Sequence, residues 1–391
     1  MKKKLVLLLA LIFALSPIIG HACTMYKITK NGSTIVGNNE DYLSPNSKFW
    51  FETGEADQFG VMYMGLLNNF AQGAINEAGL VFDGFANPNL PIVNSADKID
   101  IPIGQAIRKI MQTMSTVEEV KTYLQTINLS SLSSSQVVFV DQSGTYLIVE
   151  GDELIIGDEA EKAFSNFYYS QIESEEEVEI ENFQKGLKFL KSAQKSPSLS
   201  YCGEVMKSFS SSNSFGTQYS TIYDLNTLTV RVYLFQDYSQ FVDLDLAEEL
   251  DKGNHKVMIP DLFPMESVGR LHYQKYNDEE NPTRFLEELV GNSKEITEKE
   301  LIEMDFNSIV NVIGYEWLNE KENPVAAIKV FKYGTTIMPS DADLYDSLGE
   351  AYYDNKNYDL AKKNYKKSLS LDAENDNAKE FLLKIDSKIN N

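Results

Sequence analysis

The chain opens with a segment whose pattern predicts removal of a leader immediately before Cys23. Three lysines come first, an apolar run from Leu5 to Leu15 follows, and the small residues Gly20 and Ala22 stand at positions minus three and minus one. The run is shorter than the roughly 20 residues that cross a bilayer, so residues 1–22 predict a signal peptide and no stable membrane insertion. We therefore expect an exported protein, periplasmic or extracellular, whose fold has to begin at Cys23.

An N-terminal cysteine combines two catalytic groups in one residue. Its thiol is a nucleophile, and its free α-amino group, with a reference pKa of about 7.7 to 8, can accept the thiol proton directly or through water. No histidine is then required, so we predict that Cys23 is a nucleophile. The alternative is a lipoprotein with an acylated Cys23, but Gly20 stands where a lipobox has a leucine-like residue.

The composition is that of a folded, acidic protein. The chain is 43% hydrophobic, with 21 Phe and 21 Tyr, and the 369 residues after the leader are enough for two domains of about 150 residues each. Its formal net charge is −23, and loss of the three leader lysines takes it to −26. Such a charge repels phosphates and anionic lipids, so nucleic acid is not an expected partner.

Few residues are available for other chemistries. Cys23 and Cys202 are the only cysteines; an exported location would allow them to pair, but two cysteines exclude a disulfide scaffold. After the leader only His255 and His272 remain, far apart and without a metal-binding motif, so we expect no metal or other cofactor. Histidine-dependent papain-like and serine-triad sites have no motif here either.

The residues after Cys23 predict a β-hairpin. Residues 24–29 alternate as a half-buried strand, Asn31-Gly32 is a typical hairpin turn, and residues 34–37 begin a second strand. This strand runs into the polar cluster 37–42, which a regular hairpin brings opposite the start of the first strand. Asp41 or one of its neighbours should therefore lie close to Cys23, although a solvated turn is the alternative interpretation of the cluster.

Later segments add motifs that occur together in a known family. They are Gly73 to Leu80, Ser165 to Phe167, Gln218 to Asp224 and Thr229 to Leu234. With Cys23-Thr24 and Gly37 to Asp41, they resemble, in order, the linear amide C–N hydrolases, the choloylglycine hydrolase and penicillin V acylase family of N-terminal nucleophile hydrolases. The resemblance spans about residues 23 to 245. It implies an α+β fold over residues 23–265, a four-layer αββα sandwich of mostly antiparallel sheets covered by helices, that hydrolyses linear amide bonds.

The resemblance also implies roles for single residues. Cys23 would be the nucleophile, Asp41 the acid that orients the amine and thiol, and Asn166 an amide that holds the oxyanion or the amine. A further oxyanion donor is expected about ten residues after Asn76, which makes Asn87 the candidate. An ordinary loop is the alternative interpretation at Asn87.

Two positive charges of the related hydrolases are missing here. Where they have an arginine after the glycine, this chain has Asn38, and a later arginine before the final strand pair has no counterpart. Their absence should raise the pKa of the thiol, or favour a substrate without a carboxylate or sulfonate. Bile salts and penicillins are therefore not expected substrates. We expect a small-molecule N-acyl amide, cleaved through a thioester, with a catalytically inactive relative as the alternative.

The C-terminal part predicts a second, all-α domain. Leu348-Gly349, Tyr352 and Tyr365 fall at positions of a tetratricopeptide repeat, a helix-turn-helix unit of about 34 residues, and a weaker copy around Ile313-Gly314 precedes it. We predict a helical linker over residues 266–305 and a tetratricopeptide repeat domain over 306–391. The repeats would bind a protein or peptide partner, cap the first domain or support an oligomer. The alternative function of the whole chain is an interaction protein built on an inactive hydrolase scaffold.

Overall fold

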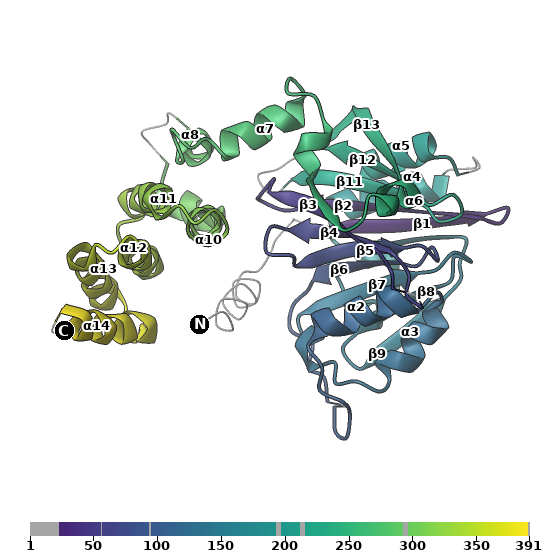
Figure 1. Ribbon diagram of the computed structural model, residues 1–391, viewed down its shortest axis with the longest axis horizontal. Helices are drawn as coiled ribbons and strands as arrows, with labels where there is room; N and C mark the ends of the chain where they lie inside the picture. The colour runs from purple at the N-terminus through teal and green to yellow at the C-terminus, as the bar shows by residue number, and fades with distance from the viewer. Residues whose placement is uncertain are drawn as a thin grey trace. The chain divides into compact units, whose positions relative to one another are not determined.

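The computed structural model describes residues 23–389, except 56, 94, 193–196, 212–215 and 292–295, so the predicted leader lies outside the described residues. The described chain divides after His272 into two compact units. The first contains two antiparallel sheets with covering helices, and the second is helical (Figure 1). The predicted α+β class, with two large sheets followed by a helical region, is confirmed.

The strands of the first unit all lie before residue 259. They are β1 Thr24–Lys30, β2 Ser33–Asp41, β3 Ser47–Glu52, β4 Val61–Leu66, β5 Ala71–Asn76, β6 Val81–Ala86, β7 Ser135–Val140, β8 Tyr146–Glu150, β9 Glu153–Gly157, β10 Glu161–Ser165, β11 Thr217–Asp224, β12 Thr229–Leu234, β13 Asp237–Asp245 and β14 His255–Met258. Its helices are α2 Ile103–Thr113, α3 Val117–Leu124, α4 Glu181–Ser192, α5 Leu199–Phe209, α6 Leu246–Asp251 and α7 Val268–Tyr276, which crosses the division between the units.

Within the described residues, the strands form two sheets. Sheet A has six strands in the order β10-β1-β2-β11-β12-β13, and sheet B has eight in the order β14-β3-β4-β5-β6-β7-β8-β9. Neighbouring strands are antiparallel throughout. Helices α4 and α5 pack on the outer face of sheet A, and α2 and α3 on that of sheet B (Figure 1). The first unit is therefore built of four layers, in the order helix, sheet, sheet, helix.

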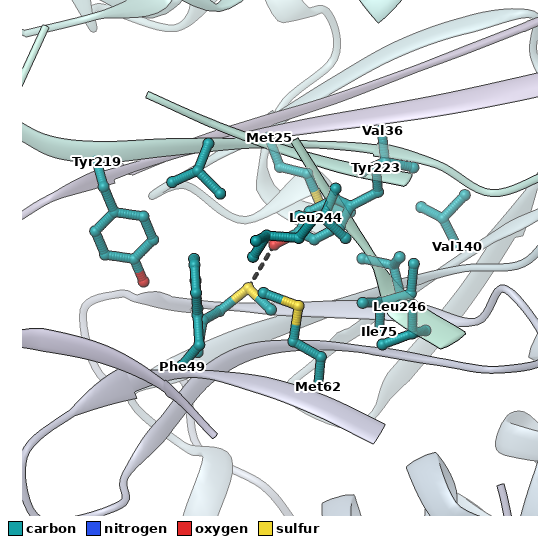
Figure 2. Packing of buried hydrophobic residues seen from close by; sticks show 14 of the residues in the cluster. Met25, Val36, Phe49, Met62, Ile75, Val140, Tyr219, Tyr223, Leu244 and Leu246 are labelled. Carbon is teal, nitrogen blue, oxygen red and sulfur yellow. Dashed lines mark hydrogen bonds between the residues drawn. The ribbon is translucent and has the colours of Figure 1, made fainter. Parts of the chain in front are cut away.

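The inner faces of the two sheets meet in an apolar core. Met25 and Val36 from sheet A pack with Met62 and Ile75 from sheet B (Figure 2). Side chains alternate across a strand, so Tyr26, the residue after Met25, packs outward among the α4 and α5 side chains. The same alternation puts Cys23 on the inner face of β1, where its side chain packs against the edge of this core.

The predicted hairpin is confirmed, and its turn explains the register of the first two strands. Asn31 and Gly32 have φ of 56° and 77°, the left-handed values that a two-residue type I′ turn requires at both positions. This turn pairs Ser33 with Lys30 and, at the far end of the hairpin, Asn39 with Thr24. The polar cluster after Gly37 is therefore carried back to the start of β1.

The second unit continues with helices α8 Arg284–Val290, α9 Glu298–Glu303, α10 Phe306–Tyr315, α11 Pro324–Ile337, α12 Ala342–Asp354, α13 Tyr358–Leu371 and α14 Asp376–Ile389, with a π-helical turn, Glu316–Glu320, after α10. From α10 to α14 each helix packs against the next. A Cβ added at Gly314 would lie 2.3 Å from the Phe331 ring, and one at Gly349 would lie 3.0 Å from the Tyr365 ring. The same glycine–aromatic contact thus recurs in both predicted repeats. Among the described residues, no helix is both long and apolar enough to cross a membrane.

Candidate active site

Strand pairing determines which residues lie beside Cys23. The residue that follows Cys23 in β1 lies opposite Asn39 of β2 on one side and Ser165 of β10 on the other. Cys23 immediately precedes β1. Continuing the two strand registers by one residue places Cys23 opposite Glu40 on the β2 side and opposite Asn166 on the β10 side. The Ser165 hydroxyl donates a hydrogen bond to the Cys23 carbonyl oxygen at 2.8 Å. The first residue of the predicted mature chain is thus held between two strands of sheet A.

The thiol of Cys23 faces a buried carboxyl group, that of Glu40. Cys23 Sγ lies 3.7 Å from Glu40 Oε2 and 3.7 Å from the backbone oxygen of Asp41. Glu40 is 1% exposed, and its two oxygens accept hydrogen bonds from Asn38 Nδ2 at 2.9 Å and from Gln72 Nε2 at 2.7 Å. Burial raises the pKa of Glu40 to about 7, although the bonds from Asn38 and the thiol act in the opposite direction. Glu40 is therefore a carboxyl that titrates near neutral pH beside the thiol.

The carboxyl of Asp41, which the resemblance assigns to orienting the amine and thiol, has a different partner. Thr217 Oγ1 donates to Asp41 Oδ1 at 2.6 Å, and Oδ2 is buried without a hydrogen bond from the described residues. Burial raises the pKa of Asp41 well above its ordinary range, the bond from Thr217 opposes this, and the charge of Glu40 adds to it. Asp41 contacts the Cys23 thiol through its main-chain oxygen, and its role at a free α-amine stays a prediction.

A further buried carboxyl, Asp83, comes from sheet B. Asp83 on β6 is 2% exposed; its Oδ1 accepts a hydrogen bond from the Gly84 N–H at 2.8 Å, and its Oδ2 is buried without a partner among the described residues. Burial raises the pKa of Asp83 well above its usual value, and the charge of Glu40 raises it further. The Tyr219 hydroxyl, which comes from the facing sheet A and lies beside Phe49 in Figure 2, is likewise buried without a partner in the described part of the chain.

These acids make the surroundings of the thiol electrically negative. Burial raises the pKa of the Cys23 thiol well above its usual range, and the charges of Glu40, Asp41 and Asp83 raise it further. Among the described residues no ion pair reaches any of the three carboxyls. Asn38 gives Glu40 a neutral amide donor. A positively charged group at this site would therefore be stabilised by the nearby carboxyls.

Two asparagine amides lie at the other side of the site. Asn166, which follows the last residue of β10, donates from Nδ2 to the Ala86 carbonyl at 2.6 Å, while its Oδ1 is buried without a partner in the described part of the chain. Asn87 follows Ala86 and is 6% exposed, and neither polar atom of its side chain has a described partner. Buried amides without partners are costly. The structure thus brings Asn166 and Asn87 to one region, and their role as oxyanion donors stays a prediction.

A buried carboxyl holds the segment that carries Asn166. Glu150, at the end of β8, is fully buried and accepts hydrogen bonds from the consecutive backbone N–H groups of Tyr169 and Ser170, at 2.9 and 2.5 Å. It also accepts from Gln136 Nε2 at 2.7 Å, and this amide donates to a backbone carbonyl of the same segment at 2.8 Å. These bonds tie the chain after β10 to sheet B.

Sequence patterns do not single out several residues of this site. Glu40 lies inside the polar cluster that the hairpin brings to Cys23, so its place in the strand is the only signal. Gln72 and Asp83 lie on strands of sheet B and reach the thiol's surroundings only when the sheets pack. Both cysteines are free, so the pairing of Cys23 with Cys202 that an exported location would allow is not formed.

No protein-family model matches the chain, and no curated protein matches it. Among solved structures, the fold is similar to that of penicillin V acylase from Agrobacterium tumefaciens, with a TM-score of 0.45 and 13% sequence identity. The match covers 58% of this chain and 86% of that one.

Proposed function

We propose that the protein is an exported amide hydrolase that uses Cys23 as an N-terminal nucleophile. The observation that carries this proposal is the position of the thiol. It lies at the head of β1, 3.7 Å from the buried Glu40 carboxyl, with the amide-bearing residues Asn166 and Asn87 on the opposite side. A nucleophile, a proton acceptor and amide donors for an oxyanion are the three parts that acyl transfer needs.

The proposed reaction proceeds in two steps. The thiol loses its proton, Sγ bonds to the carbonyl carbon of the substrate, and the carbonyl electron pair moves to oxygen, which Asn87 and the second N–H of Asn166 stabilise. The C–N bond then breaks, its electron pair stays on nitrogen, and the amine leaves with the proton. Water hydrolyses the resulting thioester and regenerates Cys23.

Cleavage before Cys23 would supply the cation that the site lacks. Burying a carboxylate without a positive partner costs free energy, and Glu40, Asp41 and Asp83 are all buried without one among the described residues. A freed α-ammonium group would stand at the start of β1, beside Glu40 in the strand register. Its charge would lower the pKa of the thiol and of the carboxyls. This supports both export with leader removal and the α-amine as a proton acceptor.

The surrounding charge also bears on the substrate. An anionic substrate group beside the thiol would lie next to carboxyls whose charge already opposes ionisation of Cys23, and like charges are weakly screened in a buried site. We propose small neutral or cationic N-acyl amides as substrates, in contrast to compounds with a carboxylate or sulfonate beside the scissile bond.

The test begins with the mature N-terminus. Intact mass and N-terminal sequencing should find a free Cys23, and a thiol-directed amide-mimicking probe should label it stoichiometrically. In a screen of N-acyl amides, we expect Cys23→Ser to be much slower and Cys23→Ala to be inactive, whereas Cys202→Ala, which removes the other thiol, should retain hydrolysis. Full hydrolysis by Cys23→Ala would overturn the proposal.

A second candidate function is carried by the helical unit, which we propose to be of the tetratricopeptide type. Helix α12 has four acidic residues at spacings of three or four, Asp343, Asp346, Glu350 and Asp354. Asp346 is buried and Glu350 accepts a hydrogen bond from Tyr315, so the two exposed acids, Asp343 and Asp354, are the ones that would favour a basic protein or peptide partner. If binding is the main function, Cys23→Ala will leave it intact and charge reversal at Asp343 and Asp354, both exposed, will remove it.

A further inference from the structure

The carboxyl of Glu40 is arranged as an acceptor of hydrogen bonds. Asn38 Nδ2 donates to Oε1, while Gln72 Nε2 and Cys23 Sγ both approach Oε2, at 2.7 and 3.7 Å. Two of these donors are amides, whose N–H groups cannot be given up as protons. The thiol is the one donor of the three that is an acid.

We propose that Glu40 is a second proton acceptor at the nucleophile, so that Cys23 and Glu40 share a single proton. The inference rests on the proposed function in one respect only, namely that the Cys23 thiolate goes on to attack an amide substrate. The sharing itself is a property of the two side chains and can be measured without a substrate.

Electrostatics favour one proton on the pair. Two adjacent buried anions repel each other strongly, so the pair keeps one proton and one negative charge over a wide range of pH. The other titratable groups that face the thiol are Asp41, Asp83, Tyr219 and, in the mature chain of the proposed function, the α-amine of Cys23. The two aspartates oppose loss of the last proton, and an α-ammonium would favour it. The pair then exists in two forms, thiol with carboxylate or thiolate with carboxylic acid, and the second form is nucleophilic.

The proton balance of the reaction is simple. The S–H bond of Cys23 breaks and an O–H bond forms on Glu40 Oε2, with the electron pair of the S–H bond left on sulfur. Sulfur then bonds to the acyl carbon. When the C–N bond breaks, the departing nitrogen takes the proton from Oε2, and Glu40 returns to its ionised form. No oxidant, reductant or metal enters this step.

A direct role and a merely electrostatic role of Glu40 predict opposite effects of Glu40→Gln. If Glu40 only adds negative charge, removing it lowers the thiol pKa and makes Cys23 react faster near neutral pH. If Glu40 accepts the proton, its removal makes Cys23 react more slowly. Asp83→Asn is the matched control, because it removes a buried carboxyl that raises the thiol pKa by charge and makes no contact with Sγ.

The experiment is alkylation of the mature protein with iodoacetamide from about pH 5 to 9, read at Cys23 by peptide mass, with the buried Cys202 as internal reference. We expect Glu40→Gln to react at least about tenfold more slowly than the wild type near pH 7, a modest share of what a positioned base contributes. We expect Asp83→Asn to react as fast as the wild type or faster. Faster alkylation of Glu40→Gln, in parallel with Asp83→Asn, would overturn the proposal.

A second variant covers the case in which Glu40→Gln does not fold. Gln72→Leu removes one amide donor from Oε2, which should raise the pKa of Glu40 because that bond stabilises the carboxylate. The acid limb of the alkylation profile should then move to higher pH. A limb that stays in place or moves to lower pH would contradict proton sharing. Since alkylation needs no amide substrate, a failed substrate screen would count against the proposed function alone.

Discussion

Glu40→Gln should also change how the stability of the first unit depends on pH. In the folded chain burial raises the pKa of Glu40 from an ordinary value of 4.5 to about 7. Between these values the folded state binds a proton at Glu40 that the unfolded state has released, so the free energy of unfolding falls as pH rises. Over about 2.5 pH units, at 1.36 kcal/mol each, the fall amounts to about 3 kcal/mol. A free α-ammonium at Cys23 would lower the pKa of Glu40 and so reduce this fall in the free energy of unfolding, which makes about 3 kcal/mol the upper value.

Glutamine cannot titrate and has nearly the shape of protonated glutamate. The variant and the wild type should therefore have similar stability near pH 4, and the variant should become the more stable protein above pH 7. The gain comes from removing a buried charge, and we expect it together with a loss of thiol reactivity. A stabilising change that reduces activity is typical of active-site residues.

The assay can be confined to the unit that contains the site. The chain has two tryptophans, Trp50 on β3 of the first unit and Trp317 in the second. In a Trp317→Phe background, fluorescence reports Trp50 alone, which is buried against α2 and α3. Urea unfolding of both proteins from pH 4 to 8 gives the stability difference at each pH. A difference that stays constant across this range would refute the reasoning, because Glu40 would then titrate alike in the folded and unfolded chains.

Two further predictions concern the amides and the helical unit. Asn87→Ala and Asn166→Ala should each lower kcat by about 10²- to 10³-fold with little change in KM, as for other oxyanion donors, and steady-state kinetics on a substrate from the screen would contradict this if only KM rose. Gly314→Ala should cost the second unit about 1–3 kcal/mol, because the new Cβ would meet the Phe331 ring at 2.3 Å. Gly104→Ala in α2, with open space at its Cβ, is the control and should be neutral or stabilising by about 0.4–1 kcal/mol; urea unfolding followed at Trp317 and Trp50 measures both.

Local sequence signals were sufficient to predict the hairpin that presents Cys23. Asn31-Gly32 requires a tight turn, and alternation along the two strands leaves a single register in which residues 38–41 return to the cysteine. The two sheets and the separate helical region were also predictable, the sheets through resemblance and the helices through their 34-residue spacing. The hairpin depends on contacts between residues that are close in the sequence, and the helical region shows a pattern that is repeated along the sequence.

The inner lining of the site could not be predicted in the same way. Gln72 lies 32 residues from Glu40 and reaches it only because sheet B packs on sheet A. Asp83 lies on an apolar strand with no motif around it. Between Glu40 and Asp41 the choice depends on one residue, since successive side chains of a strand point to opposite faces. The predicted hairpin brings both Glu40 and Asp41 near Cys23. Only the observed pairing of β2 with β1 and β11 shows that the Glu40 carboxyl faces the thiol and that the Asp41 carboxyl accepts a hydrogen bond from Thr217.

Asn38 and Glu40 can be understood as one feature of the site. An arginine at position 38 would place a positive charge beside Glu40 and lower the pKa of its carboxyl. The neutral amide of Asn38 donates one hydrogen bond without a charge, so Glu40 keeps a pKa near 7 and remains able to gain and lose a proton. On the proposal above, the neutral side chain at position 38 is what allows the buried Glu40 carboxyl to exchange a proton with the adjacent thiol.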